Sequence, residues 1–231
     1  MTEDELARLL DAAQLQPLLN AMTVRRGINQ GQAIARLRDE TRARLELVGR
    51  ERALLYKTHL LTGLRKGELA SLTVGQLDLD GPMPSAVLEA ADEKNREGST
   101  IAIRSDLATE LRQWLRDMLS RMQEDARQRG KPIPERLPSS TRLFNVPSGL
   151  LRILDRDLKL AGIPKRDERG RTVDIHALRH TFGTHLSKAG VAPRTAQAAM
   201  RHSTIDLTMN VYTDPRLLDV HGALDSLVSA R

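Results

Sequence analysis

The chain has 231 residues, of which 40% are hydrophobic and 29% charged. This balance excludes a mainly disordered or collagen-like chain, and the length suffices for a sizeable core. There is no cysteine, which excludes a disulfide framework, a thiol nucleophile and cysteine-ligated metal sites. No apolar run approaches the roughly 18 residues that cross a bilayer, and the acidic start MTEDELARLL is not a secretory signal. We therefore expect a cytoplasmic protein without a membrane span.

The formal net charge is +6 and the isoelectric point is about 10.0. Only seven of the 36 basic residues are lysine. Arginine offers a planar fork of donors that matches phosphate oxygens, so the composition points to a polyanionic partner, with nucleic acid first. The alternative is a solvated surface of arginine and glutamate with a small basic surplus.

Helical patterns dominate the first third of the chain. Thr2 and Glu5 form a capping box at the start of the first helix. Pro17 and the stretch 25–31 read as a basic loop, followed by a helix over 32–50. A further helix over 52–62 ends at Gly63, and a short helix covers 66–72.

The pattern then changes to a small hairpin, with strand-like runs at 86–90 and 100–103 around the polar turn 92–98. Helices follow over 105–129, 148–161 and 215–228, and the proline-rich stretch 130–142 is a loop. We predict a mainly α fold with a small antiparallel β-hairpin, forming a single domain over 1–231. A division near residue 135 is the second interpretation.

The most informative segment is HALRHTFGTHL, which begins at His176. On a helix, His176, Arg179, His180 and Gly183 lie on one side, which suits an anionic oxygen. Two alternatives compete with this interpretation. The two histidines could bind zinc, although Ala177 stands where a hydrolytic HExxH site needs glutamate. They could also be ordinary core or surface histidines.

Two further segments carry candidate residues. In TGLRKGEL, glycines on both sides permit a tight turn that holds Arg65 outward, and Glu68 could orient it. The alternative is a plain turn between helices with a solvated arginine. In RHSTIDLTMNVYTD, Tyr212 has polar neighbours, unlike a core tyrosine. Tyr56 lies among leucines on a helix, where packing is the expected role.

Together these segments resemble the signature boxes of the tyrosine recombinase (phage integrase) family, over about residues 50–214. The resemblance rests on an ordered set of residues, namely Arg65, Lys94, His176, Arg179, His202 and Tyr212. Two departures are local. Met200-Arg201-His202 stands where the family often has Leu-Gly-His, and His202 and Tyr212 are ten positions apart, one more than in many members. About fifty residues before the first box are too few for the family's separate DNA-clamping domain, so the chain resembles an isolated catalytic domain or a fragment.

The resemblance implies a site-specific recombinase that cleaves and rejoins duplex DNA through a 3′-phosphotyrosyl intermediate. Arg65 and Arg179 would hold the phosphate oxygens, and Tyr212 would be the nucleophile. His176 would be the base, or a hydrogen-bond partner that stabilises the phenolate, and Lys94 would be the general acid. A hydrogen bond from the remaining catalytic residue, His202, would reach the scissile phosphate. No cofactor or metal is expected, since two arginines and a lysine can replace divalent ions.

Other basic residues next to the motifs are candidates for neighbouring phosphates: Lys66, Arg96, Arg194 and Arg201. The expected partners are duplex DNA and further copies of the chain, as a tetramer on DNA, with a monomer open for the free protein. A nucleoid-associated location in a prokaryotic or phage context follows. The alternatives are a helical DNA-binding module or inactive relative, cleavage and religation like that of a type IB topoisomerase, and a metal-dependent nucleic-acid enzyme.

Overall fold

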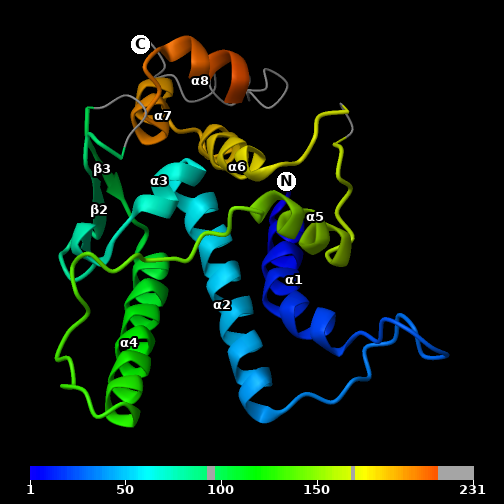
Figure 1. The fold of residues 1–231 in the computed structure, drawn as a ribbon. Helices are drawn as coiled ribbons and strands as arrows, with labels where there is room; N and C mark the ends of the chain where they lie inside the picture. Colours follow the sequence, from blue (N-terminus) through cyan, green and yellow to red (C-terminus); the bar gives the residue numbers. More distant parts are fainter. Residues whose placement is uncertain (93–96, 168–169, 213–231) are drawn as a thin grey trace, which may run out of the picture.

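The structure is a computed structural model that describes residues 1–92, 97–167 and 170–212, the last three of these by their backbone only. Within these residues, eight α-helices accompany a three-stranded antiparallel sheet (Figure 1). The mainly α class with a small sheet is therefore confirmed. In chain order the elements are α1 (Glu3–Met22), α2 (Asp39–Thr62), α3 (Lys66–Ser71), the 3-10 turn η1 (Val74–Gln76), β1 (Leu77–Asp78), β2 (Ser85–Leu88), β3 (Ser99–Ala102), α4 (Ser105–Gln128), α5 (Leu150–Leu160), α6 (Ile175–Lys188), α7 (Pro193–Met200) and α8 (Ile205–Tyr212).

Helix α1 begins as predicted and ends later. The Thr2 hydroxyl accepts the Glu5 N–H at 3.1 Å, and the Glu5 carboxylate accepts the Thr2 N–H at 2.8 Å. The helix then continues through Pro17 to Met22, so the prediction of a loop at Pro17 was wrong. Proline removes one backbone hydrogen bond from the helix, but its ring is buried here, which offsets part of that cost.

Helix α2 is one continuous helix, where the sequence predicted two. It begins at Asp39, so the predicted helical start at residue 32 was wrong. Residues 32–38 instead return toward the end of α1, where the Ala35 N–H donates to the Met22 carbonyl at 2.9 Å and Ala33 forms a bridge with Thr23. The end at Gly63 is confirmed, with a left-handed backbone at φ 59°.

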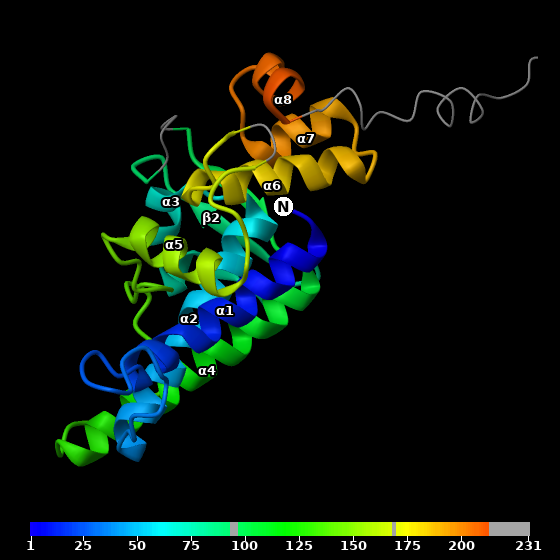
Figure 2. The ribbon, with the colours of Figure 1, turned by 90° about the vertical axis from the view of Figure 1, so that its right-hand side faces the viewer.

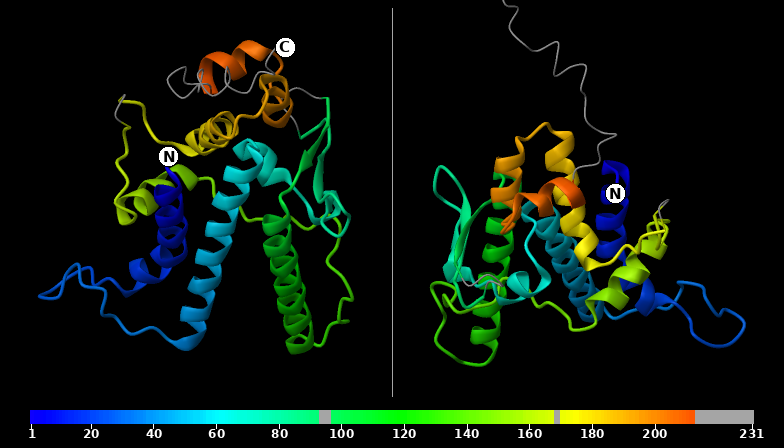
Figure 3. Two further views of the ribbon diagram at one scale, coloured as in Figure 1. Left: turned by 180° about the vertical axis from the view of Figure 1, so that it is seen from behind. Right: turned by 90° about the horizontal axis from the view of Figure 1, so that it is seen from above.

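The sheet has the order β1-β2-β3, with Ala86 opposite Ile101 and Leu77 opposite Ala86. The two predicted strands are confirmed, and β1 is an addition that the sequence did not indicate. In β2 the side chains alternate, since Ala86 and Leu88 are buried while Val87 is exposed. The sheet thus buries one face and lies beside α3 and α4 (Figures 1 and 3).

The three longest helices form the body of the molecule. Helix α2 lies between α1 and α4 in both the front and the back view, and α5 packs against α1 (Figures 1 and 3). The core is built mainly from leucine. Tyr56 is fully buried, as its predicted packing role requires, and donates to the buried Asp157 carboxylate at 2.9 Å. Arg52 completes this buried group with a 3.1 Å contact to Asp157.

The three C-terminal helices α6, α7 and α8 cover the end of α2 where α2 meets α3 (Figures 1 and 2). All three predicted motifs therefore lie at the same end of the molecule. In the described part of the chain, every helix is too short or too polar to cross a membrane. The predicted helix over 215–228 lies outside the described residues.

Candidate active site

One buried arginine on α6 joins the three motif segments. Asp174 caps α6 by accepting the Ala177 N–H at 2.8 Å, which sets the start of the helix. One turn later, Arg179 is only 1% exposed. Its Nη1 donates to the Gly63 carbonyl and its Nη2 to the Met200 carbonyl. A single guanidinium therefore ties the segment before Arg65 to the segment before His202.

Gly63 is required by both its backbone and its surroundings. Its φ of 59° lies in the left-handed region that side chains disfavour. A Cβ at this position would lie 2.4 Å from Cδ1 of Phe182 on α6. The chain therefore reverses between α2 and α3 directly against α6, and this close approach brings the Gly63 carbonyl to Arg179.

Arg65 and Glu68 make the contact that the sequence predicted. The Arg65 N–H donates to Glu68 Oε2 at 2.7 Å, and Arg65 Nη1 donates to Oε1 at 2.6 Å. Glu68 is 2% exposed and also accepts from Arg201 Nη2 at 2.6 Å. Burial raises the pKa of Glu68, but the Arg65 N–H bond and the charges of Arg201 and Arg65 outweigh it. The resulting pKa lies below 4.5, so Glu68 is a carboxylate at neutral pH.

His202 is held on its backbone and on its ring. Its N–H donates to the Gln197 carbonyl at 3.1 Å, and Gln197 Nε2 donates to the His202 carbonyl at 3.0 Å. Nδ1 lies 2.9 Å from the Thr208 hydroxyl. Burial, then the charges of Arg179, Arg65, Arg201 and His176, lowers the pKa of His202 to about 4. The imidazole is therefore neutral at pH 7 and carries one N–H.

His176 and His180 form an edge-to-face pair on α6, with ring centroids 4.7 Å apart. His176 lies one turn before Arg179 and is exposed, while His180 is half-buried. Burial and then the Arg179 charge lower the pKa of His176 below 6.5, and burial and then His176 do the same for His180. His176 is thus an unprotonated, accessible imidazole. The described residues hold no group of three or more side chains suited to a metal ion.

Two predicted catalytic residues are only partly described or undescribed. Lys94, with Arg96, lies in residues 93–96, outside the described part of the chain. Tyr212 is the last residue of α8, and its backbone follows His202 by one short helix, while its side chain is not described. The structure thus brings together Arg65, Glu68, His176, Arg179 and His202.

Three of the remaining basic candidates lie within the described residues. Lys66 Nζ donates to the Ser148 carbonyl at 3.2 Å. Arg194 is exposed at the start of α7 and donates to Gln197 at 3.1 Å. Arg201 differs from both, because its side chain is 8% exposed and lies on Glu68. A hollow of about 340 Å³ between the start of β3 and α7 is lined by Glu97, Ser99, Arg194, Gln197, Ala198, Arg201, His202 and Ser203.

A model of the phage integrase family matches residues 32–217. The chain belongs to the phage integrase family. A "tyrosine recombinase XerC-like" protein of Caldanaerobacter subterraneus subsp. tengcongensis is 28% identical over 188 residues, covering 72% of this chain and 46% of that protein. The chain thus spans about half the length of the curated relatives it matches.

Solved structures share the family fold at low sequence identity. A crystal structure of XerA recombinase has a TM-score of 0.56 and 19% identity, covering 99% of this chain and 65% of that one. A structure of XerH site-specific recombinase bound to difH substrate has a TM-score of 0.55 and 18% identity, covering 98% and 52% of the two chains.

Sequence reasoning missed two polar residues beside this family site. His59 on α2 is 1% exposed, and its pKa falls to about 4 because of burial and then the charges of Arg179 and His176. Its position inside the apolar run LLYKTHLLTG was a usable signal. Gln197 gave no such signal, because its contact with His202 depends on how α7 ends.

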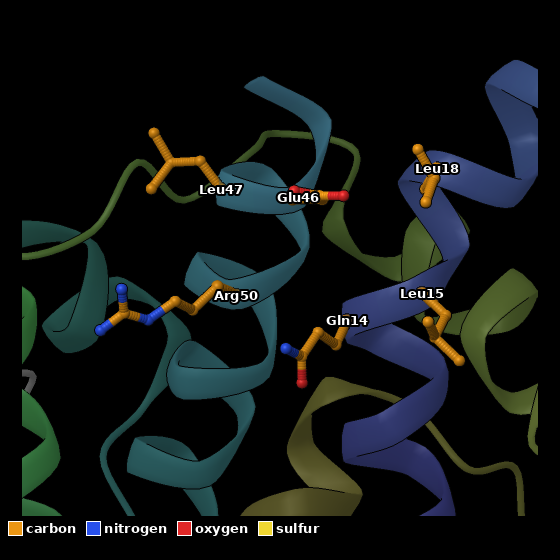
Figure 4. Close-up of a pocket in the computed structure, with 6 residues that line it drawn as sticks. All are labelled: Gln14, Leu15, Leu18, Glu46, Leu47 and Arg50. Carbon is orange, nitrogen blue, oxygen red and sulfur yellow. The ribbon is translucent and has the colours of Figure 1, made fainter. Parts of the chain in front are cut away.

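A second hollow, of about 500 Å³, lies between α1 and the N-terminal half of α2 (Figure 4). Gln14, Leu15 and Leu18 line it from α1, and Glu46, Leu47 and Arg50 line it from α2. It lies toward the end of α2 opposite to Gly63, so it is separate from the group around Arg179.

Proposed function

We propose that this chain is the catalytic unit of a site-specific DNA recombinase, which cleaves and rejoins duplex DNA through a 3′-phosphotyrosyl intermediate. The observation that carries this proposal is the Arg179 guanidinium, which bonds both the Gly63 and the Met200 carbonyls. It gathers the segments of Arg65 and His202 around one positive centre. Family membership and the likeness to a DNA-bound XerH structure support duplex DNA as the partner.

The scissile phosphate is the group that this centre would hold. Arg65 is 25% exposed, and within the described residues only Glu68 accepts from its guanidinium. Its other N–H groups therefore suit a phosphate oxygen. Arg179 would supply a second positive charge from beneath, where low solvent exposure strengthens its effect on a phosphorane-like transition state. Neutral His202 would donate its N–H to a non-bridging oxygen.

Proton transfer would accompany the exchange of one phosphoester bond for another. The Tyr212 oxygen attacks phosphorus and loses its proton to His176, which is unprotonated at neutral pH. The bond from phosphorus to the 5′ oxygen breaks, and that oxygen takes a proton from Lys94. Religation reverses these steps with a 5′-hydroxyl of the partner strand. Because the phosphotyrosyl ester keeps the energy of the broken bond, no nucleotide cofactor is required.

Further contacts would hold the duplex and the assembly. We propose that Lys66 and Arg194, which the structure describes, and Arg96, which lies outside the described residues, bind phosphates next to the scissile one. Recombining two duplexes requires four strands to be cut and rejoined, one for each Tyr212, so we propose that the chain acts as a tetramer on DNA. For a chromosomal or phage DNA substrate, we propose that the chain acts in the cytoplasm, at the nucleoid.

A nicked suicide DNA substrate tests the proposal. After cleavage, the short fragment that carries the freed 5′-hydroxyl dissociates, so religation is prevented and the covalent complex is trapped. The wild-type chain is expected to give an adduct that survives denaturant. Tyr212→Phe is expected to give none, and Tyr56→Phe serves as the matched tyrosine control that retains the adduct. The DNA sequence of the substrate is taken from duplexes that are first selected for binding to the chain. An adduct that persists in Tyr212→Phe, or its absence from the wild type on selected duplexes, contradicts the proposal.

A further inference from the structure

Arg201 has a backbone conformation that ordinarily belongs to glycine. Its φ is 52° and its ψ 48°, and among the described residues it is the one non-glycine residue with a positive φ. It directly follows α7, where the Arg201 and His202 N–H groups donate back to the Gln197 carbonyl. Helices commonly end with glycine in this position, because a Cβ there meets the backbone. The side chain of Arg201 must therefore provide something that glycine would not.

The side chain forms an ion pair that glycine could not make. Arg201 Nη2 lies 2.6 Å from Glu68 Oε2, and the two side chains are only 8% and 2% exposed. Glu68 also accepts from Arg65 through both its backbone N–H and its guanidinium, at 2.7 and 2.6 Å. One buried carboxylate thus lies between two guanidiniums, one from the N-cap of α3 and one from the turn after α7.

We propose that Arg201 is a positioning residue for phosphoryl transfer: acting through Glu68, it fixes the Arg65 guanidinium and fastens the His202 turn to α3. This inference rests on the proposed function. The two arginines and Glu68 carry a net charge of +1, whereas Arg65 and Glu68 alone would be neutral. Arg201 therefore restores the positive charge that an anionic phosphate requires, and it does so without facing the phosphate itself.

The turn that Arg201 occupies strengthens this assignment. The carbonyl of Met200, the residue before it, accepts a hydrogen bond from Arg179. His202, the residue after it, is bonded to Gln197 through both its N–H and its carbonyl. Three consecutive residues are therefore each fastened to a different part of the site. Loosening the Glu68 contact would affect the position of Arg65 and of His202 together.

A contact with a neighbouring DNA phosphate is the competing role, and the exposed Arg194, at the start of α7, is the contrast. Arg194 lies in solvent, so a phosphate could reach it without breaking a buried pair. Arg201 lines the hollow beside α7, but its side chain is only 8% exposed and its Nη2 is paired with Glu68, so a phosphate there would compete with a buried ion pair. The two arginines should therefore respond differently to substitution.

The experiment compares Arg201→Gly, Arg201→Gln and Arg201→Lys with Arg194→Gln and with Glu68→Gln. Single-turnover cleavage of the suicide substrate is measured at saturating protein, alongside DNA affinity over a series of salt concentrations. Arg201→Gly and Arg201→Gln are expected to slow cleavage tenfold to a hundredfold while changing affinity less than threefold. Arg201→Lys, which keeps the charge, is expected to recover part of the rate. Arg194→Gln is expected to weaken binding and reduce the salt slope by about one.

Two further measurements separate positioning from a merely structural role. Because Arg201 acts through Glu68, the double variant Glu68→Gln, Arg201→Gly is expected to cleave no more slowly than Glu68→Gln alone. Arg201→Gly is also expected to unfold at a higher denaturant concentration than Arg201→Gln, since both lose the ion pair and only glycine relieves the left-handed backbone. A folding defect would instead affect both variants and would multiply with Glu68→Gln.

Several results would overturn the proposal. These are cleavage at the wild-type rate in Arg201→Gly, rate losses that multiply in the double variant, or a loss of affinity with a reduced salt slope. If the wild-type chain forms no covalent adduct, the proposed function fails. The unfolding equilibria of the wild type, Glu68→Gln, Arg201→Gly and the double variant still test the contact. Coupling between Glu68 and Arg201 of at least fivefold in the unfolding constant is expected there, and its absence refutes the positioning role.

Discussion

Replacing Gly63 by alanine should weaken the fold and the site at the same place. The left-handed backbone, at φ 59°, costs a non-glycine residue about 1–2 kcal/mol. The new Cβ would also lie 2.4 Å from the Phe182 ring, and forcing such a group into a packed site costs about 1–3 kcal/mol. We therefore expect a loss of about 2–5 kcal/mol in the free energy of unfolding, measured by urea denaturation.

Gly67 provides the matched control. It lies four residues further on in α3, and a Cβ there would meet nothing within 4 Å. Gly67→Ala should therefore leave stability unchanged or raise it by up to about 1 kcal/mol, through the better helix propensity of alanine. In a second control, adding Phe182→Leu to Gly63→Ala should relieve the clash and leave the backbone cost.

The catalytic consequence follows from the Gly63 carbonyl, which accepts from Arg179. A shift of this carbonyl should slow suicide-substrate cleavage in Gly63→Ala even at temperatures where the variant is fully folded. If Gly63→Ala unfolds and cleaves like the wild type, or if Gly67→Ala is equally damaging, the assigned geometry of this turn is wrong.

Three further predictions concern buried polar groups. Tyr56→Phe removes a 2.9 Å hydrogen bond to the fully buried Asp157 and should lower the free energy of unfolding by about 1–3 kcal/mol in urea, and an unchanged value would contradict that bond. Burial lowers the pKa of His59 from 6.5 to about 4, so this histidine takes up its proton at a higher pH in the unfolded chain than in the folded one. The free energy of unfolding should therefore fall by on the order of 3 kcal/mol as the pH drops from 6.5 toward 4. His59→Leu should flatten this part of the curve of stability against pH relative to the wild type, and equal slopes in the two proteins would refute the assignment. In Arg179→Lys, the ammonium cannot bridge the Gly63 and Met200 carbonyls as the planar guanidinium does. This variant should slow single-turnover cleavage about a hundredfold, with a smaller change in DNA affinity. Equal losses in cleavage rate and in DNA affinity would indicate a binding role.

Contacts within a few residues were the predictable part of the site. The Arg65 contact with Glu68 spans three positions at a helix start, where backbone geometry alone brings the two side chains together. The capping box at Thr2 was readable for the same reason. In both cases the residue types and their spacing determine the contact.

Long-range contacts were not predictable from the sequence. Glu68 and Arg201 are 133 positions apart, and they meet only because Arg179 on α6 holds both the Gly63 and the Met200 carbonyls. Helix boundaries failed for a related reason. The apolar residues Ile34 and Leu37 fit a helical period, but backbone bonds between residues 32–35 and the end of α1 hold this stretch outside α2. Tertiary hydrogen bonds therefore overrode the local pattern.

The central claim is that Arg65, Arg179 and His202 surround one phosphate, and a crystal structure of the chain on uncleaved duplex DNA tests it most directly. Tyr212→Phe would hold the complex before cleavage. One backbone phosphate is expected within hydrogen-bond distance of Arg65 and His202, with Arg179 directly behind it. Phosphates that contact exposed residues such as Arg194, with none at Arg65 or His202, would contradict it.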